Sequence, residues 1–179
     1  LFNPAGGEPE KSGIGLRLFG CFLHATRRTR RRVLTVETSG GIADLSLSLD
    51  AHGDVNHGTV GMGRASFRPE DLPCTLPVDE LVDQPIRAGA VTLRFTGVSV
   101  GNPHCVVFRP PERPWTERDL SKLGPLLETH RIFPNFTNVQ LAVAQSRREL
   151  SLLIWERGVG ATQASGSSAS AAACAAIRA

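Results

Sequence analysis

The stretch TQASGSSASAAACAA, residues 162–176, carries no charge and passes from a serine-rich start into a run of alanines. Serine is a preferred N-cap and glycine permits a tight turn, so the pair Ser165-Gly166 predicts a helix from Gly166 onward. The first backbone N–H groups of a helix have no partner within it and lie at the positive end of its dipole. This helix start is therefore a candidate anion site.

A similar start occurs near the beginning of the chain. Residues 12–26, SGIGLRLFGCFLHAT, space their apolar side chains three and four positions apart, which predicts a helix capped by Ser12. The apolar stripe is wide, so we expect this helix to be buried on most sides. Two Ser-Gly helix starts indicate two similar units, and a facing pair could clasp a carboxylate. Taken singly, each start is explained by capping alone.

The segments between these helices are mostly strands of period two. Residues 43–50 alternate apolar and polar side chains, as a half-buried antiparallel strand does. Further strands are expected over 33–38, 55–62, 91–98, 105–108, 137–144 and 149–156. We expect a helix over 119–130, interrupted at Gly124-Pro125, and an irregular connection over the proline-rich segment 68–90. This pattern favours an antiparallel or mixed α+β fold over a doubly wound parallel sheet.

The composition is that of a globular protein. The 179 residues allow one large domain or two small ones, and 41% apolar with 21% charged residues argues against disorder. No apolar run approaches the roughly 18–20 residues of a membrane span, and no signal sequence is recognisable, so we expect a cytoplasmic protein with no membrane partner. Because the chain begins without Met and stops within an apparent helix, we expect a fragment of a longer protein.

The arrangement of the charged, cysteine and histidine residues argues against two further classes, nucleic-acid-binding proteins and zinc proteins. Much of the net charge of +3 lies in residues 27–32, RRTRRR, which fit either a nucleic-acid patch or a solvated turn after a helix. No aromatic side chains interleave these arginines, so we expect no nucleic-acid partner. The four cysteines form no CxxC pair and the five histidines show no zinc spacing. We therefore expect reduced thiols and no metal.

Two short motifs carry candidate chemistry. Asn102 and His104 lie in a turn between strands, where the amide offers donors and an acceptor and the imidazole titrates near neutrality. Glu156-Arg157 ends a strand before glycines, and this pair could bind the two charged groups of an amino acid. A structural turn and a surface ion pair are the alternatives.

These motifs occur in an order that resembles the diaminopimelate epimerase family. The segments that carry the resemblance are VGNPHCVV (100–107), LGPLLETH (123–130) with FPN (133–135), TNV (137–139) and WERGVGAT (155–162). Residues 1–3 with Gly6-Gly7, followed by SGIGLR (12–17), resemble that family's first catalytic loop. The resemblance implies two pseudo-symmetric lobes, each a curled, mostly antiparallel sheet around a central helix, with the site between them. We expect lobes at 1–90 and 91–179, the first lacking its start and the second its end.

The resemblance implies an isomerase that inverts an amino-acid α-carbon without a cofactor, in a lysine and peptidoglycan precursor pathway. One thiolate removes the α-proton and a second thiol returns a proton to the other face. The thiol positions correspond to Ser12 and Ser165, and His104 and Glu156 correspond to residues that tune them. The matches to substrate-binding positions are Asn3, Gly13, Asn102, Asn138, Glu156, Arg157, Gly166 and Ser167. The implied ligand is a diaminopimelate-like zwitterion, and a homodimer is compatible with the family.

Serine at both thiol positions, and Ile14 where the family has asparagine, depart from this pattern. A free thiol titrates at about 8.5, whereas an aliphatic hydroxyl is a far weaker acid and needs a partner base. Three functions therefore remain open. They are an epimerase that is slow or takes another amino acid, a lyase that uses His104 or Glu156 as its base, and a non-catalytic amino-acid-binding relative.

Overall fold

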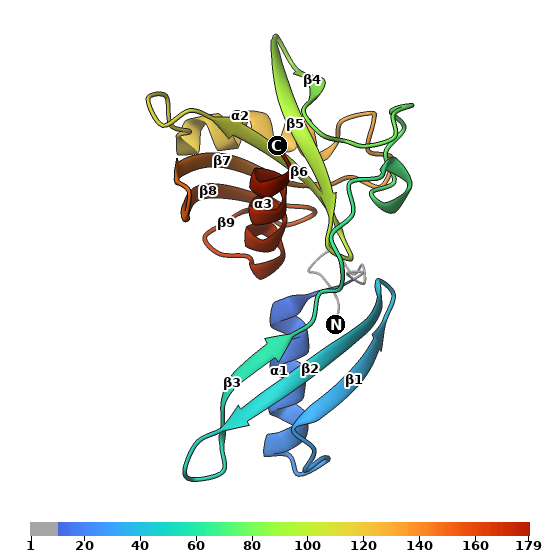
Figure 1. Ribbon diagram of the computed structural model, residues 1–179, viewed down its shortest axis with the longest axis vertical. Coiled ribbons are helices and arrows are strands. Elements are labelled where there is room, and N and C mark those ends of the chain that lie inside the picture. The colour runs from blue at the N-terminus through green and yellow to red at the C-terminus, as the bar shows by residue number, and fades with distance from the viewer. Residues whose placement is uncertain (1–10) are drawn as a thin grey trace. The chain divides into compact units, whose positions relative to one another are not determined.

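The structure is a computed structural model that describes residues 11–179, and Asn3 with the rest of residues 1–10 lies outside the described residues. The chain forms two compact units, a first unit of residues 1–64 and a second unit of residues 65–179 (Figure 1). The compact units divide between residues 64 and 65, whereas the lobe boundary that we expected between residues 90 and 91 lies next to two paired strands, β4 (Gln84–Ala88) and β5 (Val91–Ser99). Within residues 11–179, no helix is long and apolar enough to cross a membrane.

The first unit is one helix packed on a three-stranded antiparallel sheet. The helix is α1 (Gly13–Ala25), and the strands, in spatial order, are β1 (Val33–Thr38), β2 (Gly41–Leu49) and β3 (Val55–Val60). Alternate β2 side chains, among them Leu45 and Leu47, are buried, as the period of two predicted. Gly20 lets α1 approach closely, because a Cβ there would overlap the side chain of Leu45. The arginine-rich residues 27–32 form the exposed connection after α1, as expected for a solvated turn.

The expectation that α1 is buried on most sides is wrong for the described residues. Leu16 is buried against the sheet, but Leu18 is 64% exposed and Phe22 is 53% exposed. The reason is geometric: α1 packs on β2 and β3, so the sheet covers one face of the helix and leaves the opposite apolar face open.

The second unit is a six-stranded mixed sheet with one helix on each face. Its strand order follows the sequence, and every neighbouring pair is antiparallel except the parallel pair β6–β7. After β4 and β5 the elements are β6 (Pro103–Arg109), α2 (Glu117–Glu128), β7 (Asn138–Ser146), β8 (Glu149–Glu156), β9 (Gly160–Thr162) and α3 (Gly166–Arg178). The expected α+β class with mostly antiparallel sheets is confirmed.

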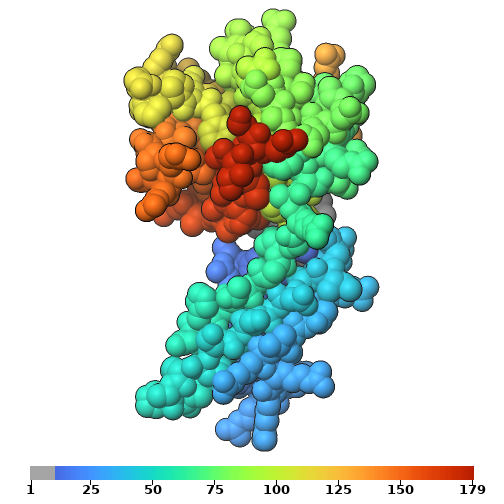
Figure 2. Space-filling view, in the orientation of Figure 1, coloured from blue at the N-terminus to red at the C-terminus, as the bar shows by residue number. Residues whose placement is uncertain are grey.

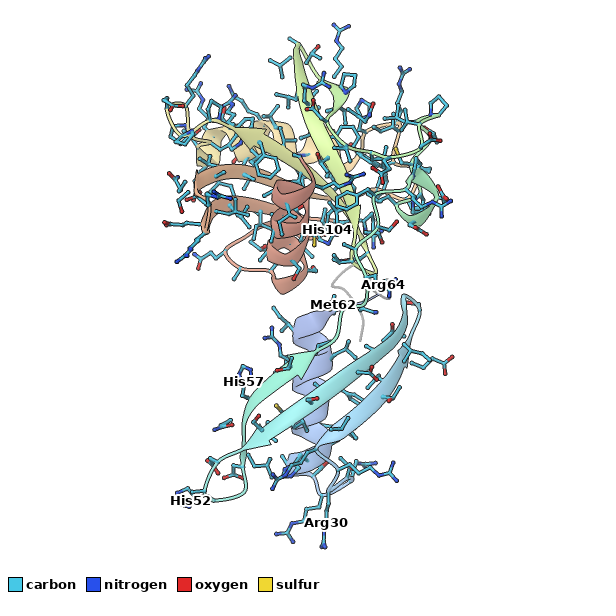
Figure 3. The ribbon with its side chains drawn as sticks, in the orientation of Figure 1. Arg30, His52, His57, Met62, Arg64 and His104 are labelled. Atoms are coloured by element: carbon cyan, nitrogen blue, oxygen red, sulfur yellow. The ribbon has the colours of Figure 1, made fainter. Side chains whose placement is uncertain are left out.

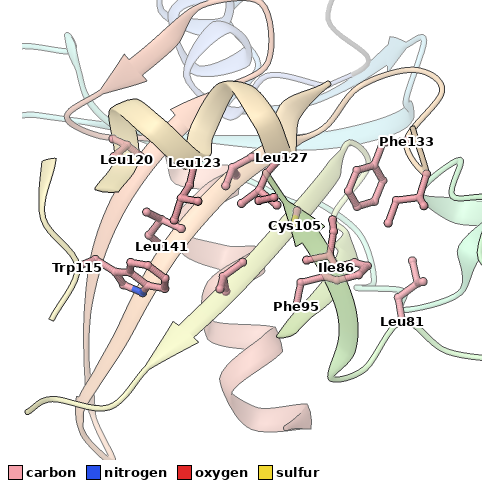
Figure 4. Packing of buried hydrophobic residues seen from close by; sticks show 14 of the residues in the cluster. Leu81, Ile86, Phe95, Cys105, Trp115, Leu120, Leu123, Leu127, Phe133 and Leu141 are labelled. Carbon is pink, nitrogen blue, oxygen red and sulfur yellow. The ribbon is translucent and has the colours of Figure 1, made fainter. Parts of the chain in front are cut away.

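Alternating side chains of this sheet build two separate cores. On β7, Leu141 points into the core under α2, where it packs with Leu123 and Leu127 (Figure 4). The next residue, Ala142, points the other way into the core under α3, which contains small residues such as Ala172. Small side chains on both surfaces allow α3 to lie close to the sheet. The outer side of α3 is open to solvent in Figure 2.

Helix α2 continues through Gly124-Pro125, so the interruption expected there is wrong. Proline removes one helix hydrogen bond, but tertiary packing holds the helix together. A Cβ on Gly124 would lie 2.6 Å from a ring atom of Trp155, which shows how tightly α2 packs on β8. The N-terminus of α2 carries a capping box between Thr116 and Asp119.

The other expected strands are confirmed to within a few residues, but two short strands were not expected. The segment 68–90, expected to be irregular, contains a short 3₁₀ turn (Pro69–Asp71) and the strand β4. Pro85 is tolerated in β4 because this strand lies at the edge of the sheet. Strand β9 has only three residues and was also not expected.

Candidate functional site

Ser12 caps the N-terminus of α1. Its Oγ accepts a hydrogen bond from the backbone N–H of Gly15 at 3.1 Å, which confirms the expected cap. The preceding Lys11 is 5% exposed, and its Nζ donates to the carbonyl oxygens of Ile42 and Met62 at 3.3 and 3.4 Å. Sequence reasoning missed Lys11, because nothing in its local pattern distinguishes it from a surface lysine. It ties the start of α1 to β2 and to the chain that follows β3.

An apolar groove of about 410 Å³ lies beside Ser12 in the first unit. One wall is the exposed face of α1, including Leu18, Phe19 and Phe22, and the other is the edge strand β1. Gly13 begins the helix, and a Cβ there would make only ordinary contact with the Met62 sulfur at 3.5 Å.

Ser165 caps the N-terminus of α3 in the second unit. It is buried, and its Oγ lies 3.5 Å from the backbone N of Ser168 and 3.3 Å from the hydroxyl of Ser167. Gly166 and Ser167 form the first turn, whose N–H groups have no partner within the helix. Gly166 is exposed, so the start of α3 is open to a small anion.

His104 is fully buried beside α3 (Figure 3), and its Nε2 lies 2.9 Å from Oδ1 of Asn102. Burial lowers the pKa of His104 to about 3; the neighbouring Gln140 side chain opposes this effect and the positive charge of Arg157 adds to it. The imidazole is therefore neutral at physiological pH and acts as a hydrogen-bonding group, not as a cation.

Asn138 joins the two motifs that the sequence singled out. Its Nδ2 donates to the carbonyl oxygen of Pro103 at 2.9 Å, and its Oδ1 accepts from the backbone N–H of Arg157 at 3.0 Å. The guanidinium of Arg157 also donates to the carbonyl oxygen of Asn135 at 3.1 Å. Asn102, His104, Asn138 and Arg157 thus belong to one connected region of the second unit.

Glu128 supports the loop that follows β8. Its carboxylate accepts from Nε1 of Trp155 at 2.6 Å and from the backbone N–H of Gly158 at 2.7 Å. Gly158 has a φ of +73°, a conformation that favours glycine. Glu156 is half-buried at the end of β8, just before this turn. Sequence reasoning gave Glu128 no site role, although it lies in the quoted segment 123–130.

Two more buried polar side chains were missed. Gln140 on β7 and Ser168 on α3 are both fully buried, and the Gln140 amide lies 3.0 Å from the Ser168 hydroxyl. Their positions in the sequence give no signal, because the pair forms only when α3 packs on the sheet. Across residues 11–179, no three His, Cys, Asp or Glu side chains gather to hold a metal ion.

A family model described as diaminopimelate epimerase matches residues 96–179. The diaminopimelate epimerase of Desulfitobacterium hafniense is 36% identical over 178 residues, which cover 99% of this chain and 61% of that protein. That of Moorella thermoacetica is 39% identical over 175 residues, covering 98% of this chain and 61% of its own. Along 98–99% of its own length, the chain is similar to diaminopimelate epimerases.

Solved structures agree with this family at the level of the fold. A hydroxyproline epimerase from Agrobacterium vitis, with bound trans-4-hydroxy-L-proline, superposes with a TM-score of 0.67 at 12% identity. It covers 98% of this chain, which spans 53% of that one. A phenazine biosynthesis protein of the PhzF family from Bacillus anthracis gives 0.51 at 16% identity, covering 95% of this chain and 57% of its own. The chain spans about three fifths of the length of its diaminopimelate epimerase relatives.

Within the family frame, the two positions that the resemblance assigns to thiols are the two N-cap serines. Each unit contributes one, at the first turn of α1 and at the first turn of α3. The cysteines lie elsewhere: Cys105 is buried in the core under α2, where burial raises the pKa of its thiol, and Cys174 lies on α3 well beyond the first turn.

Proposed function

We propose that the protein is an amino-acid epimerase that exchanges the α-proton of a zwitterion of the diaminopimelate type, without a cofactor, in a cytoplasmic lysine and peptidoglycan precursor pathway. The observation that carries this proposal is the Asn138 bridge. It joins the turn that holds Asn102 to the strand end that holds Glu156 and Arg157. Identities of 33–39% to diaminopimelate epimerases along the chain support the same assignment.

The N-terminus of α3 is the proposed binding site for the α-carboxylate of the substrate. Backbone N–H groups of Gly166 and Ser167 are oriented by the helix, and the dipole favours a negative charge there. The guanidinium of Arg157 adds positive charge in the same unit. Glu156 is the proposed partner of an ammonium group, because its carboxylate is half-buried at the adjacent strand end.

Proton transfer is the step that the serines weaken. A hydroxyl must lose its proton before it can abstract one from carbon, and it is a far weaker acid than a thiol. The helix dipole stabilises a negative oxygen at each cap, but the effect is small compared with this difference. We therefore expect slow exchange, with the α-proton leaving one face and a proton returning to either face.

A second candidate, amino-acid binding without turnover, is favoured by one observation. Among the described residues, the hydroxyl of Ser165 hydrogen-bonds only to Ser167 and Ser168, and Nε2 of the His104 imidazole faces Asn102. No basic side chain therefore activates the Ser165 hydroxyl in this conformation. The proposed binding residues of the second unit, Asn102, Asn138, Glu156 and Arg157, are nevertheless present.

The test is to incubate the full-length protein with LL-diaminopimelate in deuterated water and to follow α-deuterium by mass spectrometry. Exchange or epimerisation supports the epimerase. Binding in calorimetry without exchange supports the binding relative, and a dehydration product would point to a lyase. A protein that shows no binding and no exchange would overturn both proposals.

A matched variant strengthens the test. Ser12→Cys with Ser165→Cys should raise exchange at least about 100-fold if the scaffold is competent, because a thiol ionises far more readily. The control is Ser46→Cys with Ser170→Cys, which adds thiols on β2 and α3 away from the caps and should change nothing. An equal response of the two double variants would contradict the assigned positions.

A further inference from the structure

A buried polar cluster lies between the sheet and α3 in the second unit. Its members are His104 on β6, Gln140 on β7 and Ser168 on α3, and all three are fully buried. The parallel register pairs His104 with Asn138, so Gln140 lies two residues further along β7 on the same face. The proposed reaction assigns no role to Gln140 or Ser168.

Two atoms of this cluster, Nδ1 of His104 and Oε1 of Gln140, have no hydrogen-bond partner, although Gln140 lies within hydrogen-bonding range of the imidazole. Unpaired polar atoms at such depth are costly. The hydrogen bond between His104 and Asn102 determines which nitrogen of the imidazole carries the hydrogen. With the Asn102 amide in its present orientation, its Oδ1 faces His104 and can only accept, so Nε2 of His104 carries the hydrogen and Nδ1 needs a donor.

One rotation of the Gln140 amide satisfies both atoms. The nitrogen and oxygen of a glutamine amide are assigned from their hydrogen bonds, and exchanging them places Nε2 toward His104 and Oε1 toward Ser168. The Ser168 hydroxyl then donates to Gln140 Oε1 across the 3.0 Å contact. The result is a chain of donors that runs in one direction, from Ser168 through Gln140 and His104 to Asn102.

We propose that Gln140 and Ser168 are positioning residues that hold His104 with its proton on Nε2 and thereby orient Asn102 as a donor. Asn102 is half-buried, and its Nδ2 group hydrogen-bonds to no other described residue. With Oδ1 committed to His104, the amide offers only N–H groups to a ligand. It therefore selects an acceptor, such as a carboxylate, over a donor. This selection rests on the proposed function; the tautomer does not.

The test is ¹⁵N NMR of the His104 imidazole in the full-length protein, with His104→Gln to assign the signals. The wild-type ring should carry its proton on Nε2 at pH 7. Gln140→Glu replaces the donor with an acceptor and should move the proton to Nδ1, while Gln140→Met and Ser168→Ala should give a mixture of tautomers. Gln145→Glu is the matched control, because Gln145, on the exposed part of β7, makes a similar contact to Ser151 of β8.

A wild-type proton on Nδ1, or a Gln140→Glu ring unchanged from wild type, would overturn the proposal. If Gln140→Glu does not fold, Gln140→Met and Ser168→Ala decide the question: rings that stay entirely in the Nε2–H form in both variants would overturn the proposal. In Gln140→Glu, where Asn102 should turn its oxygen to the ligand, the affinity for diaminopimelate should fall roughly tenfold. A wild-type protein that binds no diaminopimelate refutes the proposed function and leaves the tautomer result intact.

Discussion

At the scale of single residues, the burial of His104 makes the stability of the protein depend on pH. The pKa of His104 is lowered to about 3 in the fold, while an unfolded histidine titrates near 6.5. Between these values the unfolded chain binds more protons than the folded one. The stabilisation is therefore fully present above pH 6.5 and is lost as the pH falls toward 3, by up to about 1.4 kcal/mol per pH unit.

We expect this dependence to disappear in His104→Gln. Urea denaturation between pH 7.5 and 4.5 measures it, and the free energy of unfolding of the wild type should fall more steeply than that of the variant. His130→Gln is the control, because the pKa of His130 is also lowered by burial but the side chain is only partly buried. Parallel curves for wild type and His104→Gln would contradict the prediction.

Asn138→Ala tests the bridge between the two motifs. The change leaves the carbonyl of Pro103 and the backbone N–H of Arg157 without their partner, so we expect the free energy of unfolding to fall by about 2–3 kcal/mol. Ligand affinity should fall as well. Asn56→Ala on the exposed strand β3 should cost less than about 0.5 kcal/mol. Similar losses in the two variants would show that the bridge is unimportant.

The sequence predicted the residues whose roles are local. Ser12 and Ser165 are helix caps, a role that depends only on their immediate neighbours. Glu128 and Gln140 escaped prediction because their partners come from other elements, 30 and 28 residues away along the chain. Such contacts exist only after the sheet and the helices have packed.

At the scale of elements, the packing of α2 on β8 is the most sensitive contact to test. Gly124→Ala would favour the helix by about 1 kcal/mol in isolation. Its Cβ would however lie 2.6 Å from the Trp155 ring, so we expect a net destabilisation of about 1–3 kcal/mol. Thermal unfolding followed by circular dichroism measures this, with Ser121→Ala on the exposed face of α2 as the control. A more stable Gly124→Ala protein would refute the tight packing.

Long periodic elements were predicted well and short or proline-containing ones were not. Strands such as β1 and β8 have the expected bounds, because alternation over six or more residues is a strong signal. Strand β9 is too short to show a period, and Pro85 obscured β4. Proline also suggested a break in α2, where tertiary contacts outweigh the local preference.

At the scale of the molecule, the second unit contains both of its cores within residues 65–179. We therefore expect these residues to fold when expressed alone, with a single cooperative thermal transition and a dispersed NMR spectrum. An NMR spectrum with poor dispersion, typical of a molten globule, would show that the second unit depends on the rest of the protein. The resemblance to diaminopimelate epimerases that the ordered motifs indicated is confirmed by the comparisons. The division between the compact units depends on strand pairing, which the order of motifs does not reveal.

The Asn138 bridge also has a consequence for the order of folding. Its two partners lie 35 and 19 residues away along the chain, on either side of Asn138. Closing both loops costs chain entropy that only the completed pairing of β6, β7 and β8 offsets. We therefore expect the bridge to form after the rate-limiting barrier, so that Asn138→Ala accelerates unfolding and leaves the refolding rate nearly unchanged. The loops that carry the proposed ligand-binding residues would then be the last part of the second unit to form and the first to open.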